Sequence, residues 1–261
     1  MPSTHHHGHD VGERLYVHGH SLLHRLPPEV KLVALLLFLF AVVATPAQAF
    51  WAFGVYAVVV AMLAWMARVP LRVIAPRMIV EVPFVIFAVL LPIFGTDPRI
   101  EVAGLSLSEP GLIAGWNILI KGTLGVVMSI LLAATTPARD LLAALERLRV
   151  PPLLVQIASF MLRYVHVVGD EMHRMKIARD ARGFRATGVR SWPVIAHSAG
   201  ALFIRSYERG ERVHLAMLSR GYTGRLPVLI PSTTSAADWR IAMVLPIVGV
   251  IIALAAWMSV R

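Results

Sequence analysis

Residues 50–67 read FWAFGVYAVVVAMLAWMA, a run of 18 positions without one charged side chain. A bilayer core about 30 Å thick is crossed by roughly 20 helical residues, so this stretch predicts a short membrane-spanning helix. Other apolar runs occupy 30–45, 79–94, 111–134 and 239–259. The pattern therefore predicts an all-α polytopic membrane protein with about five transmembrane helices.

The composition agrees with this fold class. Hydrophobic residues make up 57% of the 261 positions, charged residues make up 15%, and the mean hydropathy is +0.69. That is more apolar than a soluble core requires. The chain has no cysteine, which excludes disulfides and thiolate metal sites. The polar N-terminus has no small-residue cleavage site before the first span, so we expect no cleavable signal peptide.

Basic residues set the expected orientation in the membrane. Arg68, Arg72 and Arg77 follow the second span, whereas the link 46–49 carries no charge and the link 96–110 carries one arginine against three acidic residues. By the positive-inside rule, the N-terminus and the basic segment between the fourth and fifth spans are cytoplasmic. An odd number of spans then leaves the C-terminus outside. We expect a multi-pass protein of the bacterial inner (cytoplasmic) membrane.

The net charge of +10 and the pI near 11.0 belong mainly to this cytoplasmic face. The apolar spans make the lipid bilayer an expected partner of the protein, and the basic residues adjoin those spans. No aromatic-interleaved groove or recognition motif accompanies them, which argues against nucleic-acid binding.

The segment 137–225 is predicted to hold three helices. A short helix over 138–148 ends at Val150-Pro151-Pro152, and a second begins at Leu153 and reaches Arg182. A third begins at Trp192-Pro193. The second and third helices are apolar in their first halves, 153–168 and 194–204, and charged afterwards. Neither apolar half is long enough to cross a bilayer by itself, so we interpret both as packed against each other under the membrane.

The second and third helices end in related tetrapeptides, Ala181-Arg182-Gly183-Phe184 and Ser219-Arg220-Gly221-Tyr222, whose arginines are 38 positions apart. Each glycine suits the left-handed conformation that ends a helix. Narrow stripes at helical spacing lead to the two arginines; they are formed by Val168, Met172, Met175 and Arg179, and by Gly210, Val213 and Met217. Methionine adapts to partner surfaces and arginine offers a planar fork of donors. In the alternative interpretation, the two stripes pack inside the protein and the arginines bind lipid phosphates. The repetition of the pattern in two helices favours docking to partner proteins instead.

This arrangement resembles the transmembrane coupling subunit (T component) of energy-coupling-factor (ECF) transporters. The resemblance rests on the paired Ala-Arg-Gly and Ser-Arg-Gly signatures between four N-terminal spans and a C-terminal one, and it covers nearly the whole chain. The histidine-rich start and the length are more similar to the CbiQ type of cobalt importers than to the shared subunit of vitamin importers.

The resemblance implies a non-catalytic scaffold for cobalt uptake. Its partners would be two cytoplasmic ATP-binding-cassette ATPase subunits and a separate substrate-binding membrane subunit cradled by the apolar helix halves. The implied ATPase-docking residues are Ala181, Arg182, Gly183, Ser219, Arg220 and Gly221, supported by Met172, Met175, Arg179, Val213 and Met217. The implied organisation is a histidine-rich cytoplasmic segment (1–29), four transmembrane helices (30–135), cytoplasmic coupling helices (136–225) and a C-terminal transmembrane helix (226–261).

The catalytic and ATP-binding motifs that the chain lacks agree with a scaffold, but other functions stay open. The chain has no G-x-x-x-x-G-K-[ST], so another polypeptide must supply the ATP site, and it has no H-E-x-x-H or nucleophile elbow. We expect no cofactor and no resident metal. A T component of a nickel or vitamin importer remains possible, as does a membrane-embedded enzyme, for which His166, His173, His197 and Glu171 are the candidates. A secondary carrier would show broken spans with polar midplane residues, and these spans show none.

Two sets of polar residues are open to more than one interpretation. Glu81 and Lys121, with Asn117 one turn before the lysine, are the candidate intramembrane charges, and such charges are functional by default; Glu81 also lies beside Arg77, at the end of a span. The histidine cluster (His5, His6, His7, His9, His18, His20 and His24) suits first-row metals, but it is expected on the cytoplasmic side. A disordered tail or an expression-tag remnant is favoured over a specific metal site.

Overall fold

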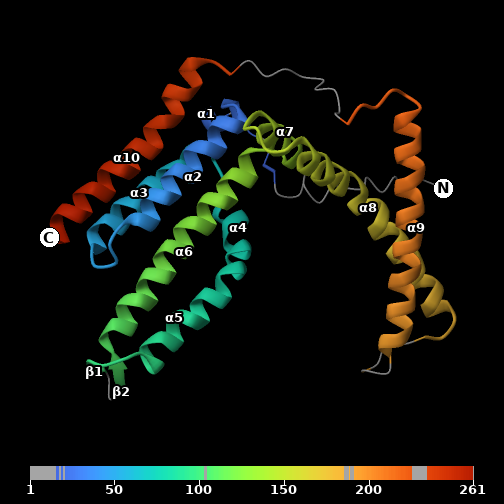
Figure 1. Cartoon of the computed structure of the whole chain (residues 1–261). Helices are drawn as coiled ribbons and strands as arrows, with labels where there is room; N and C mark the ends of the chain where they lie inside the picture. Colours follow the sequence, from blue (N-terminus) through green and yellow to red (C-terminus); the bar gives the residue numbers. More distant parts are fainter. Residues whose placement is uncertain are drawn as a thin grey trace. The chain divides into compact units, whose positions relative to one another are not determined.

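The structure is a computed structural model that describes residues 16, 17, 19, 21–102, 105–184, 188, 191–224 and 234–260. The chain divides into two compact units, and the boundary falls within α7 (Ala138–Arg147). The described residues within 15–144 and 232–261 form the membrane unit, and those within 145–231 form the helical-arm unit. Both units are almost entirely helical, which confirms the predicted fold class (Figure 1).

The membrane unit is built from five apolar helical stretches. They are α2 (Pro28–Ala44), α3 (Phe50–Met66), α5 (Val82–Phe94) preceded by α4 (Leu71–Ile74) and the 3-10 helix η1 (Ala75–Glu81), α6 (Glu109–Thr135) and α10 (Ala236–Val260), with α1 (Leu22–Arg25) before them. The stretch Arg72–Phe94, α6 and α10 are each long and apolar enough to cross a membrane. The helices α2 and α3 have 17 residues each, about 25 Å of helix. Large apolar side chains face outward, including Phe40 (69% exposed), Trp65 (80%) and Phe94 (79%), as expected for helices surrounded by lipid.

Polar contacts at both ends of α2 and α10 show that these two helices are parallel. At their starts, Thr234 donates a hydrogen bond to the carboxylate of Glu29. At their ends, the Trp257 indole donates to Ala44 O at 3.0 Å, and the Trp51 indole donates to Ser259 Oγ at 3.2 Å. The last described residues therefore lie at the same end of the unit as the link 45–49. This placement agrees with five spans, because an odd number puts the end of the last span on the same side as the link after the first span. Arg261 itself lies outside the described residues.

Glycines bring α5 and α6 into close contact. A Cβ at Gly111 would lie 2.4 Å from Leu91 O, and a Cβ at Gly115 would lie 2.6 Å from Ala88 O. This Gly-x-x-x-Gly spacing is typical of close helix pairs in membranes, where small residues let two backbones approach. The link between these helices contains a feature that the all-α prediction missed, an antiparallel hairpin of β1 (Arg99–Val102) and β2 (Leu105–Ser108). Each strand has only four residues, so its alternation of polar and apolar side chains is too short to indicate a strand in the sequence.

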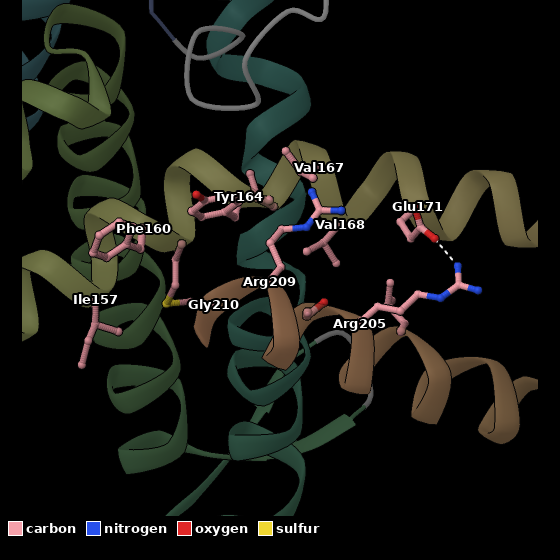
Figure 2. Close-up of a pocket in the computed structure, with 13 residues that line it drawn as sticks. Ile157, Phe160, Tyr164, Val167, Val168, Glu171, Arg205, Arg209 and Gly210 are labelled. Carbon is pink, nitrogen blue, oxygen red and sulfur yellow. Dashed lines mark hydrogen bonds and ion pairs between the residues drawn. The ribbon is translucent and has the colours of Figure 1, made fainter. Parts of the chain in front are cut away.

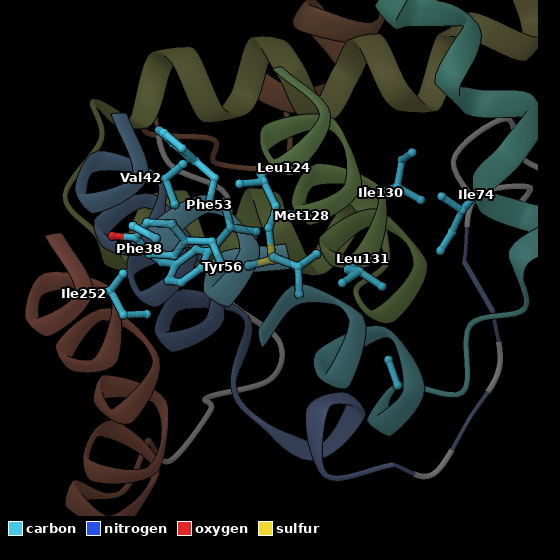
Figure 3. Close-up of a cluster of buried hydrophobic side chains, with 14 of the residues drawn as sticks. Phe38, Val42, Phe53, Tyr56, Ile74, Leu124, Met128, Ile130, Leu131 and Ile252 are labelled. Carbon is cyan, nitrogen blue, oxygen red and sulfur yellow. The ribbon is translucent and has the colours of Figure 1, made fainter. Parts of the chain in front are cut away.

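The core of the membrane unit lies between α2, α3, α6 and α10 (Figure 3). Phe38, Phe53 and Tyr56 are fully buried in it, and Phe38 and Tyr56 meet edge to face with their ring centroids 5.6 Å apart. The Tyr56 hydroxyl donates to Gly249 O at 2.8 Å and lies 3.1 Å from Thr45 Oγ1. Because the hydroxyl has partners on two neighbouring helices, this tyrosine connects α2, α3 and α10 without leaving a buried polar atom unpaired.

The helical-arm unit contains α8 (Pro152–Ala181) and α9 (Trp192–Leu218), which match the predicted second and third helices. The helix α8 continues without a break through Gly169. Its 30 residues are long and apolar enough to cross a membrane by length and composition. The expectation considered the apolar half, 153–168, alone, whereas the continuous helix is nearly twice as long.

Candidate functional site

The two arginine-glycine tetrapeptides form the same backbone motif. Gly183 and Gly221 have φ values of +76° and +82°. The Gly183 N–H donates to Asp180 O at 3.0 Å and the Phe184 N–H to Arg179 O at 3.1 Å; Gly221 and Tyr222 repeat both bonds on Leu218 O and Met217 O at 3.0 and 3.1 Å. This pair of bonds is the Schellman motif, which satisfies the last carbonyls of a helix. The sequence-based prediction of glycine caps at these positions is confirmed.

These caps present their arginines outward. All six signature residues, Ala181, Arg182, Gly183, Ser219, Arg220 and Gly221, are exposed. Within the described part of the chain, neither the Arg182 nor the Arg220 guanidinium has a hydrogen bond or an ion pair. An exposed planar fork with no partner among the described residues can bind carboxylates or carbonyls of another molecule.

The residues predicted to support the docking face are placed unevenly. Met172 is exposed, whereas Met175, Val213 and Met217 are half-buried. Arg179 is half-buried and donates from Nη1 to Ser198 Oγ at 2.9 Å, so its guanidinium joins α8 to α9. Arg179 therefore acts within the unit, in contrast to the two cap arginines.

Three sets of polar contacts show that α8 and α9 are antiparallel. Near the start of α8, Gln156 donates to Gly224 O at 2.8 Å and accepts a hydrogen bond from Tyr222. Farther along, Glu171 pairs with Arg205, and near the end Arg179 reaches Ser198. The two signatures consequently lie at opposite ends of the helix pair. Ser198 and Arg220 are 22 positions apart, which corresponds to about 33 Å along a helix.

An apolar groove of about 530 Å³ lies between the two helices. Figure 2 shows Ile157, Phe160 and Tyr164 on α8, while Arg205 and Arg209 extend from α9. At one end of the groove, the Glu171 carboxylate pairs with Arg205 and also with Arg174 at 2.9 Å. The groove thus combines an apolar floor with a charge pair, Glu171 with Arg205, at one end. The sequence pattern indicated the apolar halves, but it did not indicate which residues face each other across the groove.

Two of the four titratable residues considered for an enzyme make contacts within the helical-arm unit. Glu171 is paired with two arginines, and the His197 ring nitrogen Nδ1 lies 2.7 Å from Pro193 O in its own helix. Among the residues that the structure describes, no group of three or more histidine, cysteine, aspartate or glutamate side chains is placed to hold a metal ion. Of the histidine cluster, His24 contacts Val17 O and Ser21, and the other six histidines lie outside the described residues.

The candidate intramembrane charges bind neighbouring helices. Lys121 donates to Val43 O at 2.8 Å and Thr45 O at 3.0 Å, the carbonyls at the end of α2, where a cation is favoured by the helix dipole. Glu81 is buried and accepts a hydrogen bond from Thr123. Buried Asn117 Oδ1 has no hydrogen-bond partner among the residues that the structure describes. Lys31 is also buried and donates to Thr135 O at 3.0 Å at the end of α6. The sequence carried no signal of this contact, because a lysine so close to the start of a span looks like an ordinary interfacial charge.

Comparison with known proteins identifies the family. A sequence model of the cobalt transport protein family CbiQ matches residues 19–232. The chain belongs to the CbiQ family of cobalt transport proteins. It is 34% identical over 190 residues to the cobalt transport protein CbiQ of Rhodobacter capsulatus, covering 71% of this chain and 75% of that protein.

Two further relatives extend the likeness. The chain is 30% identical over 227 residues to the energy-coupling factor transporter transmembrane protein EcfT of Bacillus subtilis, covering 80% of this chain and 83% of the relative. It is 26% identical over 220 residues to an uncharacterized protein of Methanocaldococcus jannaschii, with coverages of 81% and 75%. As a CbiQ-family member, the chain is therefore a membrane protein that takes part in transport. The residues predicted to dock ATPase subunits lie in the part of the chain that the family model matches.

Proposed function

We propose that this protein is the transmembrane coupling subunit of an ATP-driven ECF-type importer. The observation that carries this proposal is the pair of identical, exposed arginine-glycine caps at opposite ends of the antiparallel α8–α9 pair. A spacing of about 33 Å along the helix suits two separate protein partners, each receiving one cap. The names of the CbiQ and EcfT relatives support the transporter class.

In this proposal the residues have distinct roles. Arg182 and Arg220, with Ala181, Gly183, Ser219 and Gly221, insert into two cytoplasmic ATP-binding-cassette ATPase subunits. The exposed face of Met172, together with half-buried Met175, Val213 and Met217, extends those contacts. ATP-driven approach of the two ATPases then moves the two helix ends relative to each other. The chain itself contributes no catalytic group.

The proposed organisation assigns residues 136–225 to coupling on the cytoplasmic side. Residues 30–135 and 226–261 anchor the protein in the inner membrane, and residues 1–29 precede the first span in the cytoplasm. The groove between α8 and α9 receives the substrate-binding membrane subunit, since its floor is apolar and its lining residue Ile157 is 48% exposed. An apolar surface of this kind is typical of a protein contact.

Cobalt is the proposed substrate, supported by the description of the matching family and by the name of the Rhodobacter capsulatus relative. Uptake of radioactive cobalt by cells that carry the complete complex, competed with nickel or with a vitamin, distinguishes cobalt from the alternative substrates. Preferential competition by nickel or by a vitamin would contradict the cobalt assignment while leaving the coupling role intact.

The docking role is tested by charge reversal at the caps. Removing one member of a buried interface charge pair costs about 2–5 kcal/mol, so Arg182→Glu and Arg220→Glu should each weaken ATPase binding. The double variant should lose both ATPase co-purification and cobalt uptake. Substitution of either arginine by lysine should not restore binding, because an ammonium cannot reproduce the planar fork.

Arg212→Glu is the matched control, since Arg212 is exposed on α9 two turns before the cap and makes only a 3.9 Å pair with Glu208. It should retain most of the ATPase binding. If the double cap variant inserts in the membrane, co-purifies with its ATPases and transports at the unmodified rate, the proposed docking role is wrong.

The groove is tested separately by Ile157→Asp. A carboxylate in an apolar contact loses its hydration without gaining a partner, so this variant should release the substrate-binding subunit and keep the ATPases attached. Ile177→Asp, at an exposed α8 position outside the groove and outside the apolar half 153–168, is the control and should keep both partners. Quantitative co-purification of the complex decides the outcome, and equal subunit retention by both variants would contradict the groove assignment.

A further inference from the structure

The membrane unit contains a second cavity, which the coupling role does not use. It has a volume of about 320 Å³ and lies between α2, α3, α6 and α10, with α1 at one end. Its lining is apolar except for Lys31 and Thr135, and it includes Leu35, Met62, Met128 and Leu245. An apolar cavity with one amine in its wall fits a molecule that has a hydrocarbon tail and a polar head.

The amine of Lys31 lacks a full set of partners. The residue is only 9% exposed and donates one hydrogen bond, to Thr135 O at 3.0 Å. An ammonium has three N–H donors, and the other two have no partner among the residues described. Asp140 acts on this amine through space, but the two do not form an ion pair in the described structure. A buried cation is costly unless an anion or further acceptors compensate it.

The position of the cavity in the unit indicates where its occupant comes from. Met62, Ile241 and Val244 line it and are 52%, 61% and 58% exposed, so the cavity reaches the outer surface of the helices that face lipid. Lys31 lies in the first turn of α2, and exposed Arg25 and Arg240 lie near the starts of α2 and α10. Those two starts are at the same end of the unit. Basic residues gathered at one end of membrane helices are typical of the level of the lipid headgroups.

We propose that this cavity binds one acyl chain of an anionic phospholipid from the bilayer, with the lipid phosphate against the Lys31 amine. The lipid phosphate supplies a negative charge to the Lys31 amine, which has no ion-pair partner among the described residues. The acyl chain of the lipid fills the apolar space between α3 and α10. The inference does not depend on the transport role.

The charge part of the proposal is tested with the full chain and two defined probes, phosphatidylglycerol and phosphatidylcholine of equal chain length. Native mass spectrometry of the protein released from mixed micelles should show one retained phosphatidylglycerol and a preference for it over phosphatidylcholine. Lys31→Gln keeps a donor for Thr135 O and removes the charge, so it should reduce that preference about five- to tenfold. Lys121→Gln, which removes a membrane lysine outside this cavity, should leave the preference unchanged.

The cavity part is tested by filling the space. Leu245→Trp places an indole in the cavity and should abolish retention of the lipid, whereas Ile251→Trp, on the exposed face of the same helix, should not. Equal retention of the two phospholipids by the unmodified chain would overturn the assignment of Lys31. Undiminished lipid retention by the Leu245→Trp protein would overturn the assignment of the cavity.

Discussion

At the scale of single residues, the signatures depend on a backbone conformation that glycine adopts without strain. Gly183 and Gly221 have positive φ values and an added Cβ would meet no atom within 4 Å, so the requirement for glycine comes from the backbone and not from crowding. Two arginines adopt a similar conformation elsewhere: Arg149 at φ +65° ends α7 and Arg68 at φ +53° ends α3. The sequence predicted the two glycine caps. It did not predict the positive φ values of Arg68 and Arg149, because residues other than glycine rarely adopt them.

Alanine at Gly221 should therefore loosen the cap by about 1–2 kcal/mol. Hydrogen exchange of the Tyr222 amide, which donates across the cap to Met217 O, should accelerate about five- to thirtyfold. Gly200→Ala is the matched control, because Gly200 lies inside α9 with open space around it and alanine is the better helix former there by roughly 0.5–1 kcal/mol. If the two substitutions change exchange in the same direction, the cap is not held by the glycine conformation.

At the scale of helices, two lysines reinforce the antiparallel packing of α2 and α6. Lys31 at the start of α2 donates to Thr135 O at the end of α6, and Lys121 within α6 donates to Val43 O and Thr45 O at the end of α2. Each amine satisfies acceptors that have no partner inside their own helix. The sequence marked Lys121 as an intramembrane charge of open role, and its contacts support a structural one. Their partners could not be predicted, because carbonyl positions depend on the register between two helices.

The contact between α5 and α6 should fail when a side chain is added at Gly115. A Cβ there would lie 2.6 Å from the Ala88 backbone oxygen, so Gly115→Val should separate the helices and cost about 1–3 kcal/mol or more of stability. Gly125→Val is the control in the same helix, since no atom lies within 4 Å of its Cβ position. Thermal unfolding in detergent should show a lower midpoint for Gly115→Val alone. Equal midpoints for the two variants would contradict the close backbone contact.

At the scale of the whole molecule, the sequence could predict the class of fold because hydropathy and charge report directly on the membrane. Periodicity located α8 and α9 to within a residue or two, since glycine and proline mark their ends. It could not predict the antiparallel register of α8 and α9, which depends on Gln156, Glu171 and Arg179 meeting residues far along the chain. The residues proposed for ATPase docking stay a prediction, because their partners are other proteins.

The parallel packing of α2 and α10 predicts which helix ends lie on the same face of the membrane. The contacts of Trp51 and Trp257 place the end of α10 beside the link 45–49, and the basic residues place that link outside. The chain has no cysteine of its own, so single cysteines at Gln48, Ala236 and Val260 can be labelled one at a time. In intact cells or right-side-out vesicles, a membrane-impermeant maleimide should label Gln48→Cys and Val260→Cys, and it should label Ala236→Cys only after the membrane is opened. Labelling of Gln48→Cys and Val260→Cys from opposite faces would contradict the parallel packing of α2 and α10, whereas labelling of both only from the inside would reverse the expected orientation and keep the packing.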